Sequence, residues 1–222
     1  MLHAVRQVYR ESFPPKPTFS VDDIPDLSGK VMIVTGSNAG VGKETVKALL
    51  QRNAKVVKSN HCEGGDILEL DLANLKSVKQ AAEEFIRGVM APPIKDLTSD
   101  GYYDLQFGTN VLGHFYFTKL LPPTLISTSA HHSSDGKVRI LTTSSSTHLF
   151  GAIERALTSL ILFPAPYGAL TQLWAGTTSG GASLNGKYLI PWARVGEAKK
   201  ECYDPEIGKK LWAWLDEQVK DL

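Results

Sequence analysis

Residues 35–42 have the sequence TGSNAGVG and stand between a short apolar run at 30–36 and an amphipathic segment at 41–53. The run KVMIVTG is β-branched and bounded by glycine, which predicts a strand buried on both faces. Apolar positions after the loop recur at helical spacing and end at Asn53, which predicts a helix. Glycines at such a junction let the backbone approach a pyrophosphate, whose charge is met by the N-terminus of the helix. The stretch therefore predicts an α/β fold with a site for a phosphate-bearing ligand.

Three glycine-rich phosphate loops are distinguished by their spacing. The nucleoside-triphosphate loop GxxxxGK[ST] fails at Gly42-Lys43, because Ser37 replaces its first glycine and Glu44 replaces its hydroxyl residue. The dinucleotide fingerprint GxGxxG fails as well, because Thr45 stands where its third glycine belongs. The spacing TGxxxGxG matches at every fixed position.

Further strands and helices alternate along the chain. Strands are predicted at 54–57, 67–72, 137–145 and 186–190, and helices at 75–85, 105–120 and 169–175. The repeated order of strand, helix and strand predicts a doubly wound parallel sheet with helices on both faces, a Rossmann-like α/β fold.

The two ends of the chain differ in character. Residues 1–29 are rich in proline, then acidic, and end at the turn signal Ser28-Gly29, so we expect an extended lead-in before a single domain at 30–222. A C-terminal helix is predicted with Asp204 as N-cap and Pro205 at its first position. Its predicted buried stripe is Ile207, Leu211, Leu215 and Val219.

Composition excludes several classes of protein. The 222 residues include 24 Lys and Arg against 23 Asp and Glu, and a net charge of +1 gives no global footprint for nucleic acid or an anionic membrane. Two cysteines without CxxC spacing predict a reduced, intracellular chain. The N-terminus lacks an apolar signal segment, and the most apolar stretch, 157–170, contains two prolines. We expect a soluble, cytoplasmic protein with no metal site.

The glycine loop also resembles a known family. TGSNAGVGKETVKALLQRNAKV at 35–56 is similar to the opening of the short-chain dehydrogenase/reductase family, in particular its retinol-dehydrogenase-like and fungal NADP-dependent members. The resemblance continues in LELDLANLKSVK at 68–79, YDLQFGTNVLGHFYFTKLL at 103–121 and RILTTSSSTHLF at 139–150. It implies an oxidoreductase that interconverts an alcohol and a carbonyl on a small-molecule substrate. The implied cofactor is NADP, with NAD as the alternative, and a homo-oligomer is common among relatives.

Individual residues take roles from this resemblance. The positions that match the cofactor-binding residues of the family are Gly36, Ser37, Asn38, Gly40, Val41, Gly42 and Asp71. Asn110 matches the helix asparagine that helps to hold a water in the proton relay. Ser145 matches the serine that hydrogen-bonds the substrate carbonyl or hydroxyl. On the residues alone, each has an alternative interpretation. The alternatives are a solvated strand end for Asp71, an exposed or capping side chain for Asn110, and part of a polar strand exit for Ser145.

Parts of the family pattern are missing. The chemistry needs a Tyr and a Lys four residues apart, yet none of the seven tyrosines has a lysine at the fourth position on. The family's NNAG strand is also absent, because EEFIR at 83–87 runs directly into GVMAPP at 88–93. We therefore expect an incomplete fold, without a central strand and the catalytic helix, and impaired catalysis. Two alternatives are a non-catalytic dinucleotide-binding remnant and the product of a truncated coding sequence.

Overall fold

The computed structural model describes residue 7 and residues 9–37, 39–59, 66–68, 103–131, 137–145 and 163–221. The chain divides into two compact units. Unit 1 comprises Met1–Leu27 and Arg139–Ala198, and unit 2 comprises Ser28–Val138 and Lys199–Leu222. Each is described by itself below.

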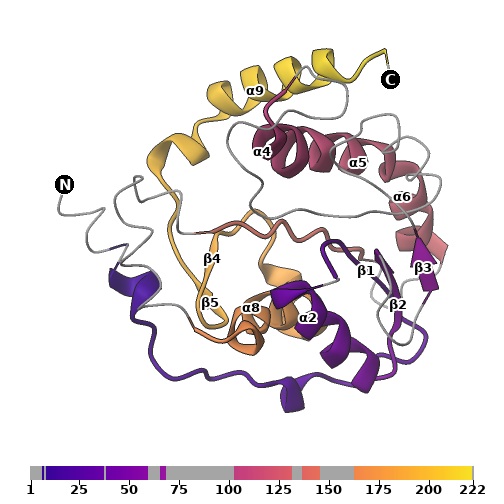
Figure 1. The fold of residues 1–222 in the computed structure, drawn as a ribbon, viewed down its shortest axis with the longest axis vertical. Helices are drawn as coiled ribbons and strands as arrows, with labels where there is room; N and C mark the ends of the chain where they lie inside the picture. Colours follow the sequence, from indigo (N-terminus) through magenta and orange to yellow (C-terminus); the bar gives the residue numbers. More distant parts are fainter. Residues whose placement is uncertain are drawn as a thin grey trace. The chain divides into compact units, whose positions relative to one another are not determined.

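Unit 2 contains a parallel sheet in the order β1-β2-β3 (Figure 1). Its strands are β1 (Val31–Val34), β2 (Lys55–Ser59) and β3 (Asp66–Leu68), and Val31 lies opposite Lys55. The helix α2 (Gly40–Gln51) connects β1 to β2, and Asn53 adopts a left-handed φ of 65° just after it. Asparagine tolerates this conformation, which ends the helix where the apolar pattern stops. The predicted strand, helix and strand at 30–57 are confirmed as elements. The predicted burial of the first strand on both faces is wrong, because Val31 and Ile33 are exposed and, among the described residues, β1 has a neighbouring strand on one side alone. Of the predicted strand at 67–72, only the first two residues are described, and the predicted helix at 75–85 lies outside the described residues.

A second group of helices in unit 2 forms a continuous segment. It comprises α4 (Leu105–Phe107), the π-helix η2 (Gly108–Gly113) and α5 (His114–Leu120), and α6 (Pro122–His131) follows. The predicted helix at 105–120 is confirmed, with a π-helical turn at its centre. Near the end of the chain lie the 3-10 helix η6 (Lys200–Tyr203) and α9 (Pro205–Gln218).

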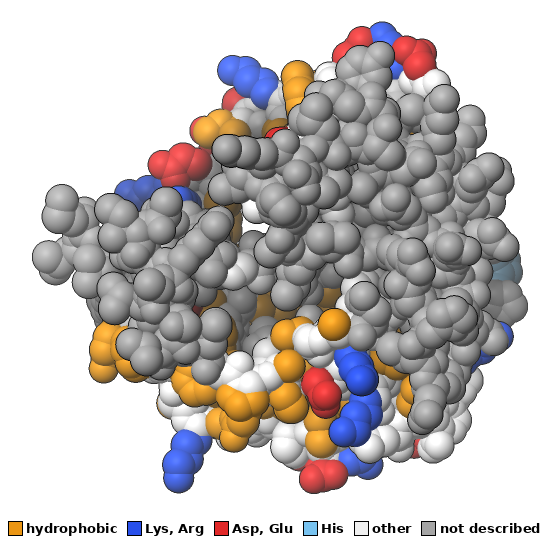
Figure 2. All heavy atoms as spheres, viewed as in Figure 1, with side chains coloured by type: hydrophobic (Ala, Val, Ile, Leu, Met, Phe, Trp, Pro, Cys, Tyr) orange, Lys and Arg blue, Asp and Glu red, His pale blue; other side chains and the backbone are white. Residues whose placement is uncertain are grey.

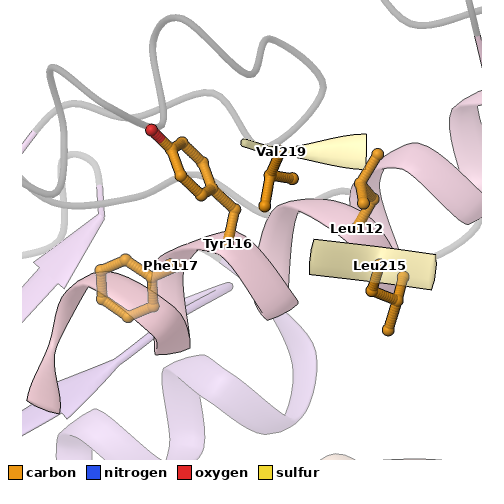
Figure 3. Close-up of a cluster of buried hydrophobic side chains, with 5 residues drawn as sticks. All are labelled: Leu112, Tyr116, Phe117, Leu215 and Val219. Carbon is orange, nitrogen blue, oxygen red and sulfur yellow. The ribbon is translucent and has the colours of Figure 1, made fainter. Parts of the chain in front are cut away.

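The core of unit 2 lies between these helices (Figure 3). Leu112, Tyr116 and Phe117 project from η2 and α5, and Leu215 and Val219 meet them from the end of α9. Val57 of β2 packs against this cluster. Side chains alternate between the two faces of a strand, so the fully buried Val56 faces the other side of the sheet. The helix α2 contacts β1 and β2, and unit 2 has helices on both faces of its sheet, as expected for an α/β fold.

The start of α9 has the predicted cap. The carboxylate of Asp204 accepts hydrogen bonds from the backbone N–H groups of Glu206 at 2.8 Å and Ile207 at 3.3 Å, and Pro205 occupies the first helical position. Lys119 of α5 forms an ion pair with Asp216 of α9 at 2.5 Å.

The predicted buried stripe of α9 is wrong in its first half. Leu215 and Val219 are buried, but Ile207 and Leu211 are about half exposed. Periodicity predicts which residues share a face, whereas the length of the packing partner decides how much of that face is covered. The buried cluster with η2 and α5 reaches only the end of α9.

The described elements of unit 1 are short apart from the helix α8 (Ala165–Thr177), and residues 9–12 are also helical. The other elements are η1 (Val21–Asp23), η5 (Ser179–Ser183), β4 (Leu189–Ile190) and β5 (Arg194–Val195), with β4 and β5 antiparallel. The predicted helix at 169–175 is confirmed, and the strand predicted at 186–190 is shortened to two residues. Before β1, the side chains of Phe19, Ile24 and Leu27 are buried.

The strand predicted at 137–145 is absent, since these residues have no regular secondary structure. Side-chain contacts with α8 hold residues 139–145 of this segment within unit 1. Arg139 Nη1 donates to the carbonyl of Gly176 at 2.9 Å, and Thr143 donates to Gln172 Oε1 at 3.0 Å. Val138, Ile140 and Leu141 are exposed. A sequence rich in β-branched residues forms a strand only where a neighbouring strand offers backbone hydrogen bonds, so composition alone did not make this segment a strand.

In the described part of the chain, no helix is long and apolar enough to cross a membrane. The face drawn in Figure 2 shows Lys and Arg side chains among acidic and apolar ones, without a continuous patch of one sign among the coloured residues.

We expect the stability of the protein to fall in mild acid because of His114. Burial lowers the pKa of His114 below its ordinary value of 6.5. The unfolded chain therefore takes up this proton at a higher pH than the folded chain, so the contribution to stability is present above pH 6.5 and is lost as the pH falls below it. Urea unfolding between about pH 7.5 and about pH 5.5 should show a shallower decline for His114→Gln than for the wild type.

Candidate functional site

The loop between β1 and α2 is built on left-handed glycines. Gly36 has a φ of 62° and Gly40 a φ of 52°. Residues with a Cβ rarely adopt such values, so glycine is needed at both positions for the chain to turn from the strand into the helix. A Cβ built on either residue would have no heavy atom within 4 Å, which leaves open space beside the loop backbone.

Gly42 is needed for a different reason, namely close packing. A Cβ at Gly42 would lie 2.1 Å from the carbonyl oxygen of Gly36 and 2.8 Å from its carbonyl carbon. The first turn of α2 therefore rests directly on the backbone of the loop. The spacing TGxxxGxG thus combines two left-handed turns with one close approach.

The first turn of α2 is arranged to meet an anion. Its N-cap, Ala39, has no side-chain oxygen to accept hydrogen bonds from the first N–H groups, and the turn contains no acidic residue. The N-terminus of a 12-residue helix carries a partial positive charge, to which the exposed Lys43 adds. Backbone N–H groups and open space together fit the phosphates of a dinucleotide.

The structure brings together five of the seven predicted cofactor-binding residues. Gly36, Ser37, Gly40, Val41 and Gly42 all lie at the junction of β1 and α2. Ser37 is fully buried, and the carbonyl of Val41 accepts a hydrogen bond from the hydroxyl of Thr45 at 2.8 Å. Asn38 and Asp71 lie outside the described residues.

Asn110 lies in the π-helix η2 of unit 2, and its side chain is exposed. Next to it, the hydroxyl of Thr109 is buried without a hydrogen-bond partner among the described residues. π-Helical turns are rare and occur frequently at functional sites. The turn was not predicted, because the apolar spacing of residues 105–120 fits an ordinary helix.

Ser145 is assigned to unit 1, whereas the glycine loop and Asn110 belong to unit 2. Ser145 is the last described residue of the segment 137–145, and it is exposed. Its predicted role, like that of Asn110, stays a prediction.

Tyr116 and Tyr167 both lack the surroundings that a replacement for the missing acid needs. Tyr116 has Lys119 three residues on, but it belongs to the buried cluster and Lys119 is paired with Asp216. Burial raises the pKa of Tyr116 despite the opposing effect of Lys119, which is contrary to what a proton-donating phenol needs. Tyr167 of unit 1 is exposed, and its ring is tilted by 52° against that of Trp192, with the ring centroids 5.4 Å apart. Its fourth position on is Thr171, not a lysine.

Comparison with known proteins identifies the family, although no family model matches the chain. Two proteins from Armillaria gallica named short-chain dehydrogenase/reductase are 40% and 38% identical to it, and each alignment covers 95% of this chain and 97% of the relative. The chain belongs to the short-chain dehydrogenase/reductase family, whose members are oxidoreductases. The expected resemblance is confirmed.

A solved structure agrees on the fold. The crystal structure of an uncharacterized protein from Mycobacterium paratuberculosis superposes with a TM-score of 0.61 at 23% identity, covering 91% of this chain and 97% of that one. The predicted Rossmann-like α/β class is thereby confirmed. The alignments with the Armillaria proteins extend over 303 positions, more than the 222 residues of this chain, so they include positions at which this chain has no residue.

Proposed function

We propose that this chain binds a nicotinamide dinucleotide, NADP(H) in preference to NAD(H), at the junction of β1 and α2. The proposal rests on the loop geometry, in which Gly42 contacts Gly36 closely while the positions beside Gly36 and Gly40 stay open. The exposed Lys43 in the first turn of α2 favours the cofactor with the additional phosphate.

Each part of the loop has a proposed task. The N–H groups at the start of α2 hold the pyrophosphate, and Ser37 and Asn38 contact phosphate or ribose, as in the family pattern. Asp71 is proposed to meet the adenine. When bound, the dinucleotide supplies or accepts the hydride, and the residues of the chain position it and handle the proton.

We propose further that the alcohol–carbonyl oxidoreductase activity of the family is impaired in this chain. Ser145 can hydrogen-bond a substrate oxygen and Asn110 can hold a water, but no tyrosine with a lysine four residues on is present to exchange the proton. General acid–base catalysis contributes about 10²- to 10⁴-fold to a rate. A loss of this size would leave a cofactor-binding protein with little turnover. The positions without a residue in the alignment with relatives support this proposal.

The proposal predicts cofactor binding without appreciable turnover. NADPH added to the pure chain should quench the fluorescence of its four tryptophans in a saturable manner, with a weaker effect from NADH. A panel of aldehydes, ketones and alcohols should give turnover about 10²- to 10⁴-fold below that of an intact family member measured in parallel. Rapid turnover would overturn the impairment and leave binding standing. An absence of saturable quenching would overturn the cofactor site.

Gly36→Ala tests the site against a matched control, Gly29→Ala. Both glycines have positive φ and open space around the position of a Cβ, so both alanines should introduce a similar backbone strain of about 1–2 kcal/mol. Only Gly36 lies in the proposed site. NADPH quenching should therefore weaken in Gly36→Ala and persist in Gly29→Ala.

A further inference from the structure

The stretch of chain before β1 belongs to unit 1, and its second part is firmly anchored there. Phe19, Ile24 and Leu27 are buried, and the 3-10 helix η1 begins at a complete capping box formed by Ser20 and Asp23. Burial of three large apolar side chains fixes this part of the chain on unit 1.

Residues 7–13, which we call the clasp, are held with much less apolar surface. The rings of Tyr9 and Phe13 contact each other, with their centroids 5.2 Å apart, yet the two residues are 64% and 57% exposed. Three prolines within residues 14–17 separate the clasp from the anchored part. Because proline fixes φ, they form a stiff link, so the clasp can move as a unit.

Two side-chain hydrogen bonds join the clasp to β5 and to the residues that follow it. Gln7 Nε2 donates to the carbonyl of Glu197 at 2.9 Å, and Arg194 Nη2 donates to the carbonyl of Arg10 at 3.1 Å. The buried carboxylate of Glu11 accepts a further hydrogen bond from Gln7 Nε2 at 3.1 Å, which orients that amide. Each bond of this kind stabilises only modestly, because water replaces it when the contact opens.

The hairpin that the clasp touches is short and depends on its neighbours. β4 and β5 pair over two residues each, and an isolated hairpin is marginally stable in water. Arg194 Nε also donates to the carbonyl of Pro191 at 2.7 Å, so one guanidinium joins the clasp to the turn between the strands. That turn carries Trp192, whose ring centroid lies 4.8 Å from that of Phe163 and 5.4 Å from that of Tyr167.

We propose that residues 7–13 form a releasable clasp, which opens and closes while the rest of unit 1 stays folded and which loosens the β4–β5 turn when it opens. In the closed state, Arg194 holds the clasp and the turn together. In the open state, Arg194 loses its acceptor on Arg10, and the turn keeps its remaining contacts, among them the hydrogen bond from the N–H of Ala193 to Thr171 Oγ1 at 3.1 Å. Segments with few buried apolar contacts open locally in this way. The clasp thereby controls the order of the turn that positions Trp192.

Hydrogen exchange of single amides in the full chain tests whether the clasp opens by itself. The N–H of Phe13 donates to the carbonyl of Tyr9 at 2.9 Å within the clasp, and Leu173 is a buried residue in α8. As urea is raised toward the unfolding transition, exchange of the Phe13 amide should stay nearly constant, because opening the clasp exposes little surface. Exchange of the Leu173 amide should accelerate. An equal dependence on urea at both amides would mean that the clasp and α8 open together, and would overturn the proposal.

Gln7→Ala tests the contact between the clasp and the hairpin. Loss of the hydrogen bond to Glu197 should accelerate exchange of the Phe13 amide about 2- to 10-fold. The N–H of Gly196, which donates to the carbonyl of Tyr188 at 2.8 Å in the hairpin, should accelerate with it. The Leu173 amide should keep its wild-type rate. Acceleration at Phe13 without any at Gly196 would contradict the coupling to the hairpin.

Gln51→Ala is the matched control, at an exposed glutamine that ends α2 in unit 2, and it should change none of these rates. A second variant, Arg194→Lys, replaces the planar fork that reaches Arg10 and Pro191 by a single ammonium group. It should accelerate the Phe13 and Gly196 amides as Gln7→Ala does. Wild-type rates in both clasp variants, or equal acceleration in the control, would show that these contacts do not hold the clasp.

Discussion

Replacing Gly42 by alanine is expected to abolish NADPH binding at micromolar concentrations and to destabilise the protein by about 1–3 kcal/mol. The added Cβ would lie 2.1 Å from the carbonyl oxygen of Gly36, so the first turn of α2 and the loop must separate. Separation moves the N–H groups of the helix away from the place where the pyrophosphate is proposed to bind. Fluorescence titration with NADPH measures the binding, and urea unfolding measures the stability.

Gly208→Ala is the matched control for this prediction. Gly208 is also a helical glycine, in the exposed first half of α9, but a Cβ there would meet nothing within 4 Å. The same substitution should stabilise the chain by about 0.5–1 kcal/mol and leave NADPH binding unchanged, because alanine favours the helix. Gly42→Ala with wild-type binding would show that the close approach to Gly36 is not needed for the cofactor.

The local sequence predicted the glycine loop and the helix ends, where the residue type itself determines the backbone conformation. The loop at 35–42 needs glycine at Gly36 and Gly40 for left-handed φ, and at Gly42 for close packing. Because three of the eight residues must be glycine for these reasons, few other loop conformations fit the sequence. The caps of the helices are similarly local, and Asp204 and Asn53 both lie where they were expected.

Features that depend on distant partners were not predictable in the same way. Residues 137–145 have the composition of a strand, yet they contact α8 through side chains and form no ladder. The π-helical turn that contains Asn110 leaves the apolar spacing of residues 105–120 nearly unchanged, so periodicity does not reveal it. The roles of Asn110, Ser145 and the dinucleotide loop depend on the family resemblance and on the experiments proposed above.

The helix α9 tests how far hydrophobic periodicity predicts which side chains are buried. Leu211 and Leu215 are one turn apart in the predicted stripe, but Leu215 is 6% exposed and Leu211 is 51% exposed. Leu215→Ala should lower the free energy of unfolding by about 2–5 kcal/mol, because it opens a cavity beside Leu112 and Val219.

Leu211→Ala should change the same quantity by no more than about 1 kcal/mol, since about half of the side chain is in water already. Urea unfolding of both variants, followed by circular dichroism, gives the two values under one set of conditions. Equal losses would mean that Leu211 is buried in solution, either by the chain itself or by another molecule, and repetition of the measurement at several protein concentrations separates those cases. A large difference that does not depend on concentration would show that the core of unit 2 ends within α9, between two leucines that the sequence pattern treats alike.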